Sequence, residues 1–176
     1  MPVSVSQELL DVVDEDNRVI GVKTRGEVHL KGLMHRSVHI LVFNSVGDLF
    51  LQKRSMNKDN DPGLWDSSAA GHLDSGEDYR GCAIRELGEE LGIVGPVLLD
   101  QLFRLQASPV TGMEHCIVYR CIHDGPFELQ AEEIDEGTWI SLSEMDRRVA
   151  EPDPELTGVI RLIWNKFRQN SDFSEV

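Results

Sequence analysis

Positive charge is scarce in this sequence. Its 176 residues include 17 lysines and arginines against 31 aspartates and glutamates, which gives a formal net charge of −14. Nucleic-acid polymers and anionic membrane surfaces are bound by basic faces, so this balance argues against both kinds of partner. An acidic chain also repels anionic small molecules. A role in phosphate chemistry would therefore require divalent cations between the protein and its substrate.

Cysteine is also rare, and long hydrophobic runs are missing. The three cysteines, Cys82, Cys116 and Cys121, are an odd number without a paired spacing, which indicates a reducing compartment. We expect them to be buried small side chains, with Cys116 and Cys121 on opposite faces of one strand. Residues 1–10 lack the basic head and apolar run of a secretory signal, and no stretch reaches the length of a membrane span. A cytoplasmic protein is the resulting expectation.

The length fits one domain, residues 1–176, whose core needs no disulfides. Residues 37–43 are apolar on both faces, which is typical of a central strand. We expect an α+β fold in which helices sandwich a mixed central sheet, with an N-terminal β-hairpin extension in residues 1–34. The other expected segments are strands at 8–13, 18–23, 48–54, 64–69, 97–105, 116–122 and 138–140, a helix or loop at 24–33, and helices at 143–149 and 156–167.

Residues 77–91 predict an amphipathic helix. Asp74 or Ser75 can cap its start, and Gly92 can end it. The apolar stripe of this helix consists of Ala83, Ile84, Leu87 and Leu91.

Three glutamates cluster on this helix. Glu86, Glu89 and Glu90 stand at i, i+3 and i+4, so they share one face with side chains about 5–6 Å apart. Like charges at this spacing destabilise a helix by roughly 0.2–0.5 kcal/mol per pair. Gly81 and Gly88 each cost about 1 kcal/mol more relative to alanine. Local rules broken together indicate a functional site, and carboxylate oxygens are what Mg²⁺ binds. A solvated acidic face is the alternative.

Two charged residues surround the cluster. Arg85 lies four residues before Glu89 and can hold its carboxylate through a charge-assisted hydrogen bond. Glu77 falls in the expected first turn, where the helix dipole favours a negative charge. We therefore expect both residues to support the glutamates.

The string from Gly71 to Ile93 resembles the catalytic box of the Nudix hydrolases. That box is a glycine, five residues, a glutamate, seven residues, Arg-Glu, an aliphatic residue, any residue, Glu-Glu, any residue, a glycine and an aliphatic residue. Every prescribed position is filled over residues 71–93. The resemblance implies a Nudix-type α/β/α sandwich. It also implies hydrolysis of a diphosphate bond in a nucleoside diphosphate-linked or related compound, by attack of water on phosphorus. The implied site has Mg²⁺ or Mn²⁺ bound by Glu86, Glu89, Glu90 and the carbonyl of Gly71, with Arg85 orienting the carboxylates and Glu77 supporting Arg85.

The flanking residues 9–54 and 62–72 resemble a narrower branch, related to isopentenyl-diphosphate isomerase. In the isomerase a cysteine immediately precedes the Gly-His pair and serves as an acid–base group. Here that position is Ala70, whose methyl group cannot transfer a proton. The full set of glutamates favours a hydrolase. An isomerase and a non-catalytic nucleotide-sensing module are the alternatives.

The same resemblance draws attention to histidines. In the isomerase, histidines at positions like His35 and His72 bind a metal together with a glutamate that matches Glu114. A structural role is the alternative for both histidines. His29 and His39 have no motif behind them.

The substrate is expected to be a small-molecule diphosphate, and its anionic end needs cations. The candidate substrate-binding residues are Arg36, Lys53, Arg54, Trp65 and His72, with surface solubility or core packing as the alternative. The candidates for an additional base or ligand are Glu114, Glu132 and Glu133. The sequence leaves the oligomeric state open, and a homodimer is one alternative because dimers are common in the family that the chain resembles. The leaving group depends on loops such as residues 106–113.

Overall fold

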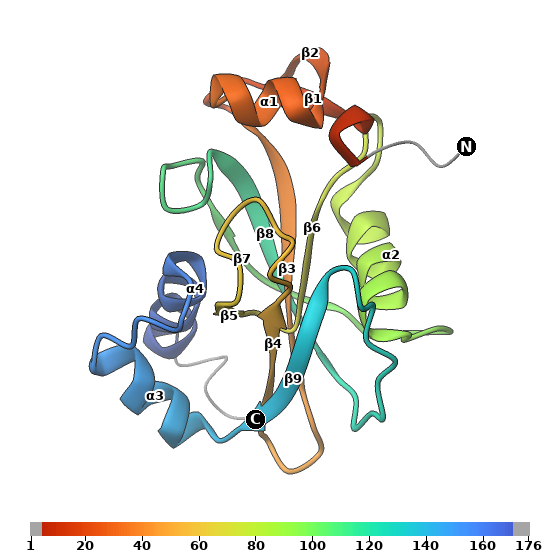
Figure 1. The fold of residues 1–176 in the computed structure, drawn as a ribbon. Helices are drawn as coiled ribbons and strands as arrows, with labels where there is room; N and C mark the ends of the chain where they lie inside the picture. The colour runs from red at the N-terminus through yellow and green to blue at the C-terminus, as the bar shows by residue number, and fades with distance from the viewer. Residues whose placement is uncertain (1–4, 171–176) are drawn as a thin grey trace.

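The computed structural model describes residues 5–170. The elements, in chain order, are η1 (Val5–Gln7), β1 (Leu9–Val13), β2 (Val19–Thr24), α1 (Arg25–Lys31), β3 (His35–Phe43), β4 (Leu49–Arg54), β5 (Trp65–Asp66), β6 (Ala69–His72), α2 (Tyr79–Leu91), β7 (Asp100–Leu105), β8 (Glu114–Ile122), β9 (Ile134–Ile140), α3 (Leu142–Ala150) and α4 (Gly158–Gln169). Seven strands form one sheet in the order β5-β4-β3-β8-β7, with β6 paired to β3 and β9 to β4. The sheet is mixed because β3 and β8 run parallel. Figure 1 shows α2 on one side of this sheet, with α3 and α4 on the other.

The strand β3 is central, as predicted. It pairs with β4, β6 and β8. Val38, Ile40 and Val42 pack into the core that includes α2, whereas Leu41 and Phe43 pack into the core that includes α4. The period of two along a strand sends alternate side chains to opposite faces, so β3 builds two cores at once. The expected α/β/α sandwich is therefore confirmed.

The N-terminal extension is a hairpin outside the main sheet, also as predicted. β1 and β2 pair antiparallel as a separate two-stranded sheet, and α1 lies next to them (Figure 1). Residues 24–33, which the sequence left open as helix or loop, contain α1. Thr24 and Glu27 form a reciprocal capping box at its start, and Gly32 ends it in the left-handed conformation.

The single strand predicted at 64–69 is instead two short strands, β5 and β6. Ser67 and Ser68 lie between them. The Ser68 hydroxyl donates to the carbonyl of Phe50 at 2.6 Å and accepts from the backbone N–H of Val42 at 2.8 Å. A side chain thus occupies the backbone groups that a continuous strand would have paired.

The helix α2 begins later than predicted. Asp78 is its N-cap, in place of Asp74 or Ser75, and accepts from the N–H of Gly81 at 2.8 Å. Glu77 therefore lies before the helix and not in its first turn. This is a correction to the dipole role expected for that residue.

The rest of α2 follows the prediction more closely. Gly92 ends it with a φ of 70°, as expected. Ile84 was placed in the apolar stripe but is 43% exposed, and Cys82 is buried on that face instead. Other boundaries also shift: β7 begins at Asp100, β9 begins at Ile134, and Ser141 caps α3 in place of residue 143.

The cysteines are free and buried, as predicted. Cys116 packs on the α4 side of the sheet and Cys121 on the α2 side, which confirms their opposite faces. Among the helices of residues 5–170, none is long and apolar enough to cross a bilayer.

Candidate active site

A cleft of about 830 Å³ runs past one edge of the central strands. Its walls come from α1, β3, β6 and α2, and from the loop residues 58–61 and 109–113. Two clusters of chemically active side chains line it. One is the glutamate cluster of α2, and the other is a group of histidines.

Arg85 is the centre of the glutamate cluster. Its Nε and Nη2 atoms donate to the two carboxylate oxygens of Glu77 at 2.8 and 2.9 Å. Its Nη1 atom donates to Glu86 at 2.8 Å and to Glu89 at 3.2 Å. The hydrogen bonds with Glu77 raise the pKa of Arg85 above its ordinary value, so the guanidinium stays charged. Glu77 thus anchors the arginine from outside the helix, and the arginine positions two carboxylates.

Glu86 and Glu90 are buried carboxylates, with 8% and 5% of their surface exposed. Glu90 accepts hydrogen bonds from the Gln52 amide at 3.0 Å and from the backbone N–H of Ala70 at 3.3 Å. Burial raises the pKa of Glu86 to about 7 and holds the pKa of Glu90 well above its ordinary value. Glu89 is the more exposed member, since 52% of its side chain is accessible. The charged form of the buried pair is poorly compensated by the protein alone, and protons are therefore retained in the absence of a cation.

Gly71 is in contact with this cluster. A Cβ atom built on Gly71 would lie 2.0 Å from Oε1 of Glu86 and 2.8 Å from its Cγ. Only a glycine lets β6 approach the carboxylate so closely. The Gly71 carbonyl has the Cys82 thiol as a distant partner at 4.0 Å. A backbone oxygen and three carboxylates beside one strand are hard oxygen donors, so the residues present fit Mg²⁺ or Mn²⁺.

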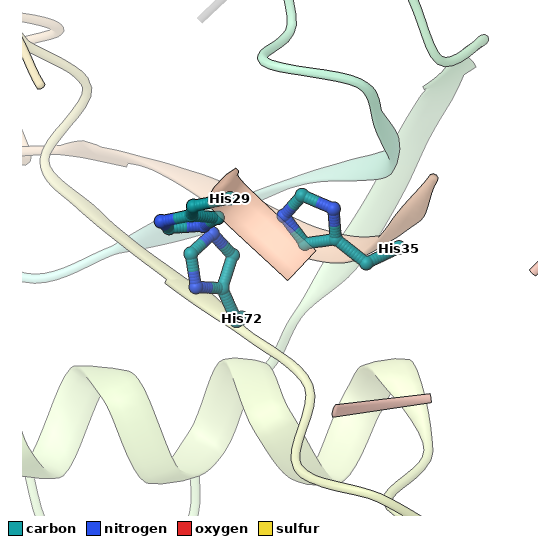
Figure 2. A group of neighbouring side chains, drawn as sticks. All are labelled: His29, His35 and His72. Carbon is teal, nitrogen blue, oxygen red and sulfur yellow. The ribbon is translucent and has the colours of Figure 1, made fainter. Parts of the chain in front are cut away.

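A second cluster gathers three histidines from separate elements. Figure 2 shows the rings of His29 from α1, His35 from β3 and His72 from β6 drawn together. One ring nitrogen from each lies within 4.8 Å of the others. Nε2 of His72 lies 2.9 Å from a carboxylate oxygen of Glu114, and Nε2 of His35 lies 3.5 Å from the same oxygen. Imidazole nitrogens and a carboxylate are ligands that transition metals favour.

Two of these histidines, His29 and His72, favour their neutral form. Burial lowers the pKa of His29 to about 4 and also lowers the pKa of His72. Nδ1 of His35 faces the Leu33 carbonyl at 2.9 Å, and this contact fixes the ring. A neutral imidazole whose other nitrogen is fixed in this way is the form that ligates metals. No sequence motif pointed to His29, because its side chain joins the cluster only through the packing of α1.

The structure brings together some of the predicted substrate residues and not others. Arg54, His72, Glu114 and Glu133 line the cleft. Those outside the lining are Arg36, Lys53, Trp65 and Glu132.

The predicted residues that do not line the cleft have other partners or lie in other surroundings. Arg36 donates to the Asn17 side chain at 2.8 Å and so ties the hairpin to the sheet. Trp65 lines a separate surface pocket with Trp139. Lys58 and Arg25 line the cleft instead, although their positions in the sequence gave no reason to choose them.

The fold and site together define a class of hydrolase. A mixed sheet lies between helices, and a clamped glutamate helix contacts a glycine of an adjacent strand. A model of the NUDIX domain matches residues 33–158. The chain belongs to the Nudix family and is a Nudix hydrolase, an enzyme class that acts on diphosphate bonds.

The similar proteins agree with this assignment. An uncharacterised Nudix hydrolase of Yersinia pestis is 34% identical over 172 residues, which cover 96% of this chain and 92% of that protein. The isopentenyl-diphosphate Δ-isomerase of Serratia proteamaculans is 34% identical over 141 residues, or 78% of this chain and 79% of the isomerase. The crystal structure of DR0079 from Deinococcus radiodurans superposes with a TM-score of 0.81 at 26% identity, covering 90% of this chain and 98% of DR0079.

Adding one methyl group at Gly71 should disable the glutamate cluster. In Gly71→Ala the new Cβ overlaps Glu86, so the carboxylate must leave its position. We expect metal affinity and turnover of any diphosphate substrate to fall at least about 10-fold, the effect of misplacing one ligand. The matched control is Gly21→Ala on β2, where a Cβ has nothing within 4 Å. Unchanged metal affinity in Gly71→Ala would contradict the close contact.

The raised pKa of Glu86 predicts that its contribution to the stability of the fold decreases as pH rises, the opposite of a carboxyl group with a lowered pKa. Its folded pKa of about 7 lies above the ordinary 4.5, so the folded state holds an extra proton between these values. The stability contributed by this group is lost as pH rises through about 7. The pKa of His29 is shifted in the opposite direction, so His29 has the opposite effect on stability as pH changes. The readout is therefore the Tm of the wild type minus the Tm of Glu86→Gln, because both proteins contain His29. This difference should fall from about pH 5 to about pH 8 without metal, and less so with Mg²⁺. A difference that rises with pH would refute the assignment.

Proposed function

We propose that this Nudix hydrolase depends on Mg²⁺ or Mn²⁺ and cleaves a diphosphate bond in a nucleoside diphosphate-linked or related compound, by attack of water on phosphorus. The observation that supports it best is the arginine clamp. Arg85 holds Glu86 and Glu89 toward the cleft while Glu77 fixes it from behind. A helix that served only as a solvated acidic face would not bury two of its glutamates.

Each residue of the cluster has a separate task. Glu86, Glu90 and the Gly71 carbonyl supply oxygen donors in the cleft. A bound divalent cation would neutralise these oxygens and polarise a phosphoryl oxygen of the substrate. Glu89 is the most exposed of the three glutamates and is placed to meet the substrate side. Arg85 fixes the carboxylates before the substrate arrives, which removes reorganisation from the reaction.

Candidates for a proton acceptor beyond the helix also differ in position. Glu133 lines the cleft and pairs with Lys58, whose ammonium group lies against its carboxylate. Glu114 lines the cleft but is engaged by two histidines. Glu132 is exposed and outside the lining. We therefore favour Glu133 as the additional base.

The histidine cluster is proposed as a second metal site of the same cleft. His29, His35, His72 and Glu114 offer three imidazole nitrogens and a carboxylate. The resemblance to the isomerase supports this reading for His35, His72 and Glu114. Close to the glutamate cluster, such a site would add positive charge for an anionic substrate and so help to offset the net charge of the chain.

Removing one negative charge at Glu89 should nearly abolish turnover. Glu89→Gln keeps the shape of the side chain and loses its charge, so metal-dependent hydrolysis should fall about 100-fold or more while the fold persists. Product formation from a panel of diphosphate compounds with Mg²⁺ and with Mn²⁺ measures it. The matched control is Glu136→Gln, an exposed glutamate on β9 outside the cleft. Full activity in Glu89→Gln would refute its role. Tight binding without turnover across the panel in the wild type would favour the sensing module.

Isomerase chemistry is the second candidate function, favoured by the histidine cluster and by the isomerase relative. Ala70 opposes it, since a methyl group cannot carry a proton to or from an alkene. Incubation of the protein with isopentenyl diphosphate and Mg²⁺ should therefore yield no allylic isomer. Detection of that isomer by nuclear magnetic resonance would reverse the ranking of the two functions.

A further inference from the structure

One imidazole in the cleft belongs to neither cluster. His39 lies on β3, directly opposite Ala70 in the antiparallel pairing with β6. It lines the cleft with 5% of its surface exposed. Side chains opposite each other on paired strands are close neighbours on the same face. The small side chain of Ala70 therefore leaves the ring of His39 accessible from the cleft.

The ring of His39 is oriented from behind. Its Nδ1 atom lies 2.7 Å from the hydroxyl of Ser67. That hydroxyl donates to the carbonyl of Ala69 at 3.3 Å, so it accepts the proton of Nδ1. The tautomer that follows leaves Nε2 as an acceptor. Within residues 5–170, Nε2 of His39 has no hydrogen-bond partner.

A second polar group lies on the same face of β3. Ser37 is two residues before His39, so both side chains point to the same side of the sheet. The Ser37 hydroxyl is buried, and in the part of the chain that the structure describes its neighbour is the Cys116 thiol, a weak partner that leaves most of its hydrogen-bonding capacity unused. Both residues line the cleft. Buried polar groups without partners are costly unless a ligand or water satisfies them.

The lining restricts what can bind there. It contains no phenylalanine, tyrosine or tryptophan from the described chain, so the group bound beside His39 has no large aromatic side chain to pack on. The carboxylates of Asp66 and Glu114 also line this part, and they repel an anion but accept from hydroxyl groups. The apolar side chains of the whole lining are Val28, Ala70, Pro109, Val110, Met113 and Val159. These are too few to surround a hydrocarbon group on all sides.

We propose that His39, with Ser37 beside it, binds a hydroxyl group of the moiety attached to the diphosphate, and that this moiety is a sugar or another polyol. The inference rests on the proposed hydrolase function and names its substrate class. The orienting contacts place Nε2 where a hydroxyl can donate to it. Asp66, which lies 3.9 Å from Nδ1 of His39 and accepts from the N–H of Ser67, holds the ring in this orientation.

In a histidine with a purely structural role, the second ring nitrogen would be expected to form a hydrogen bond with another group of the protein. His115 is such a residue, with the same exposure of 5%. Its Nε2 atom faces the carbonyl of Asp14 at 3.0 Å, outside the cleft lining. The comparison makes His115→Phe the matched control for His39→Phe, since both remove two ring nitrogens from a buried strand position.

The test measures binding of two ligands that differ only in hydroxyl groups. One is a nucleoside diphosphate sugar, and the other is the alkyl ester of the same nucleoside diphosphate. Titration calorimetry with Ca²⁺ in place of Mg²⁺ reports affinity without turnover. We expect the wild type to prefer the sugar compound by roughly 10-fold, about the effect of one hydrogen bond. His39→Phe should abolish the preference, and His115→Phe should keep it.

The outcomes separate the two proposals. No preference in the wild type, or an equal loss for both ligands in His39→Phe, would overturn the polyol site. A preference without hydrolysis in Mg²⁺ would support the site while refuting the hydrolase proposal. Hydrolysis without a preference would support the hydrolase proposal and overturn the polyol site. Because His39→Phe can fail to fold, Ser67→Ala serves as a second variant. It frees the ring from its partner, and it should reduce the preference without removing it.

Discussion

The ion pair between Arg85 and Glu77 is the contact on which the glutamate cluster depends. Glu86 and Glu90 are buried and repel each other, and α2 cannot hold them in one arrangement by its own hydrogen bonds. Arg85 compensates part of the charge of Glu86, and Glu77 holds the guanidinium through two further hydrogen bonds. A buried charge network of this kind does not maximise stability, because desolvation offsets most of the attraction. In the proposed function, its use is to fix carboxylate oxygens in place before a cation binds.

Local periodicity made much of the fold and of this cluster predictable. The spacing of Glu86, Glu89 and Glu90 places them on one helix face whatever the rest of the chain does. The two-faced apolar pattern of β3 likewise required cores on both sides of the sheet. The start of α2 was less predictable, because several side chains near residue 77 can cap a helix. Only tertiary packing selected Asp78, and that choice put Glu77 outside the helix.

Residues brought in by long-range packing could not be found from local pattern. His29 reaches the histidine cluster because α1 places its ring 5.4 Å from that of His35 at the start of β3, and the sequence left that segment open as helix or loop. Arg36 and Lys53 were predicted to bind substrate because they are cations near the catalytic box. The alternation of side chains along a strand decides which residues face the cleft, and neither of these two lines it. Arg36 instead holds Asn17 of the hairpin. Charge near a motif is therefore weak evidence for a substrate contact.

The strand β6 explains how two different clusters come to share one cleft. Its successive residues alternate in direction, so Gly71 faces α2 and contacts Glu86, whereas Ala70 and His72 face the other side. On that side Ala70 lies next to His39, and His72 joins the histidine group. A diphosphate bound near Gly71 would thus have metal-binding oxygens on one side of the strand and imidazoles on the other. In the proposed function, the chemistry belongs to the helix side of β6, and discrimination among attached groups belongs to the side of His39 and the histidine cluster.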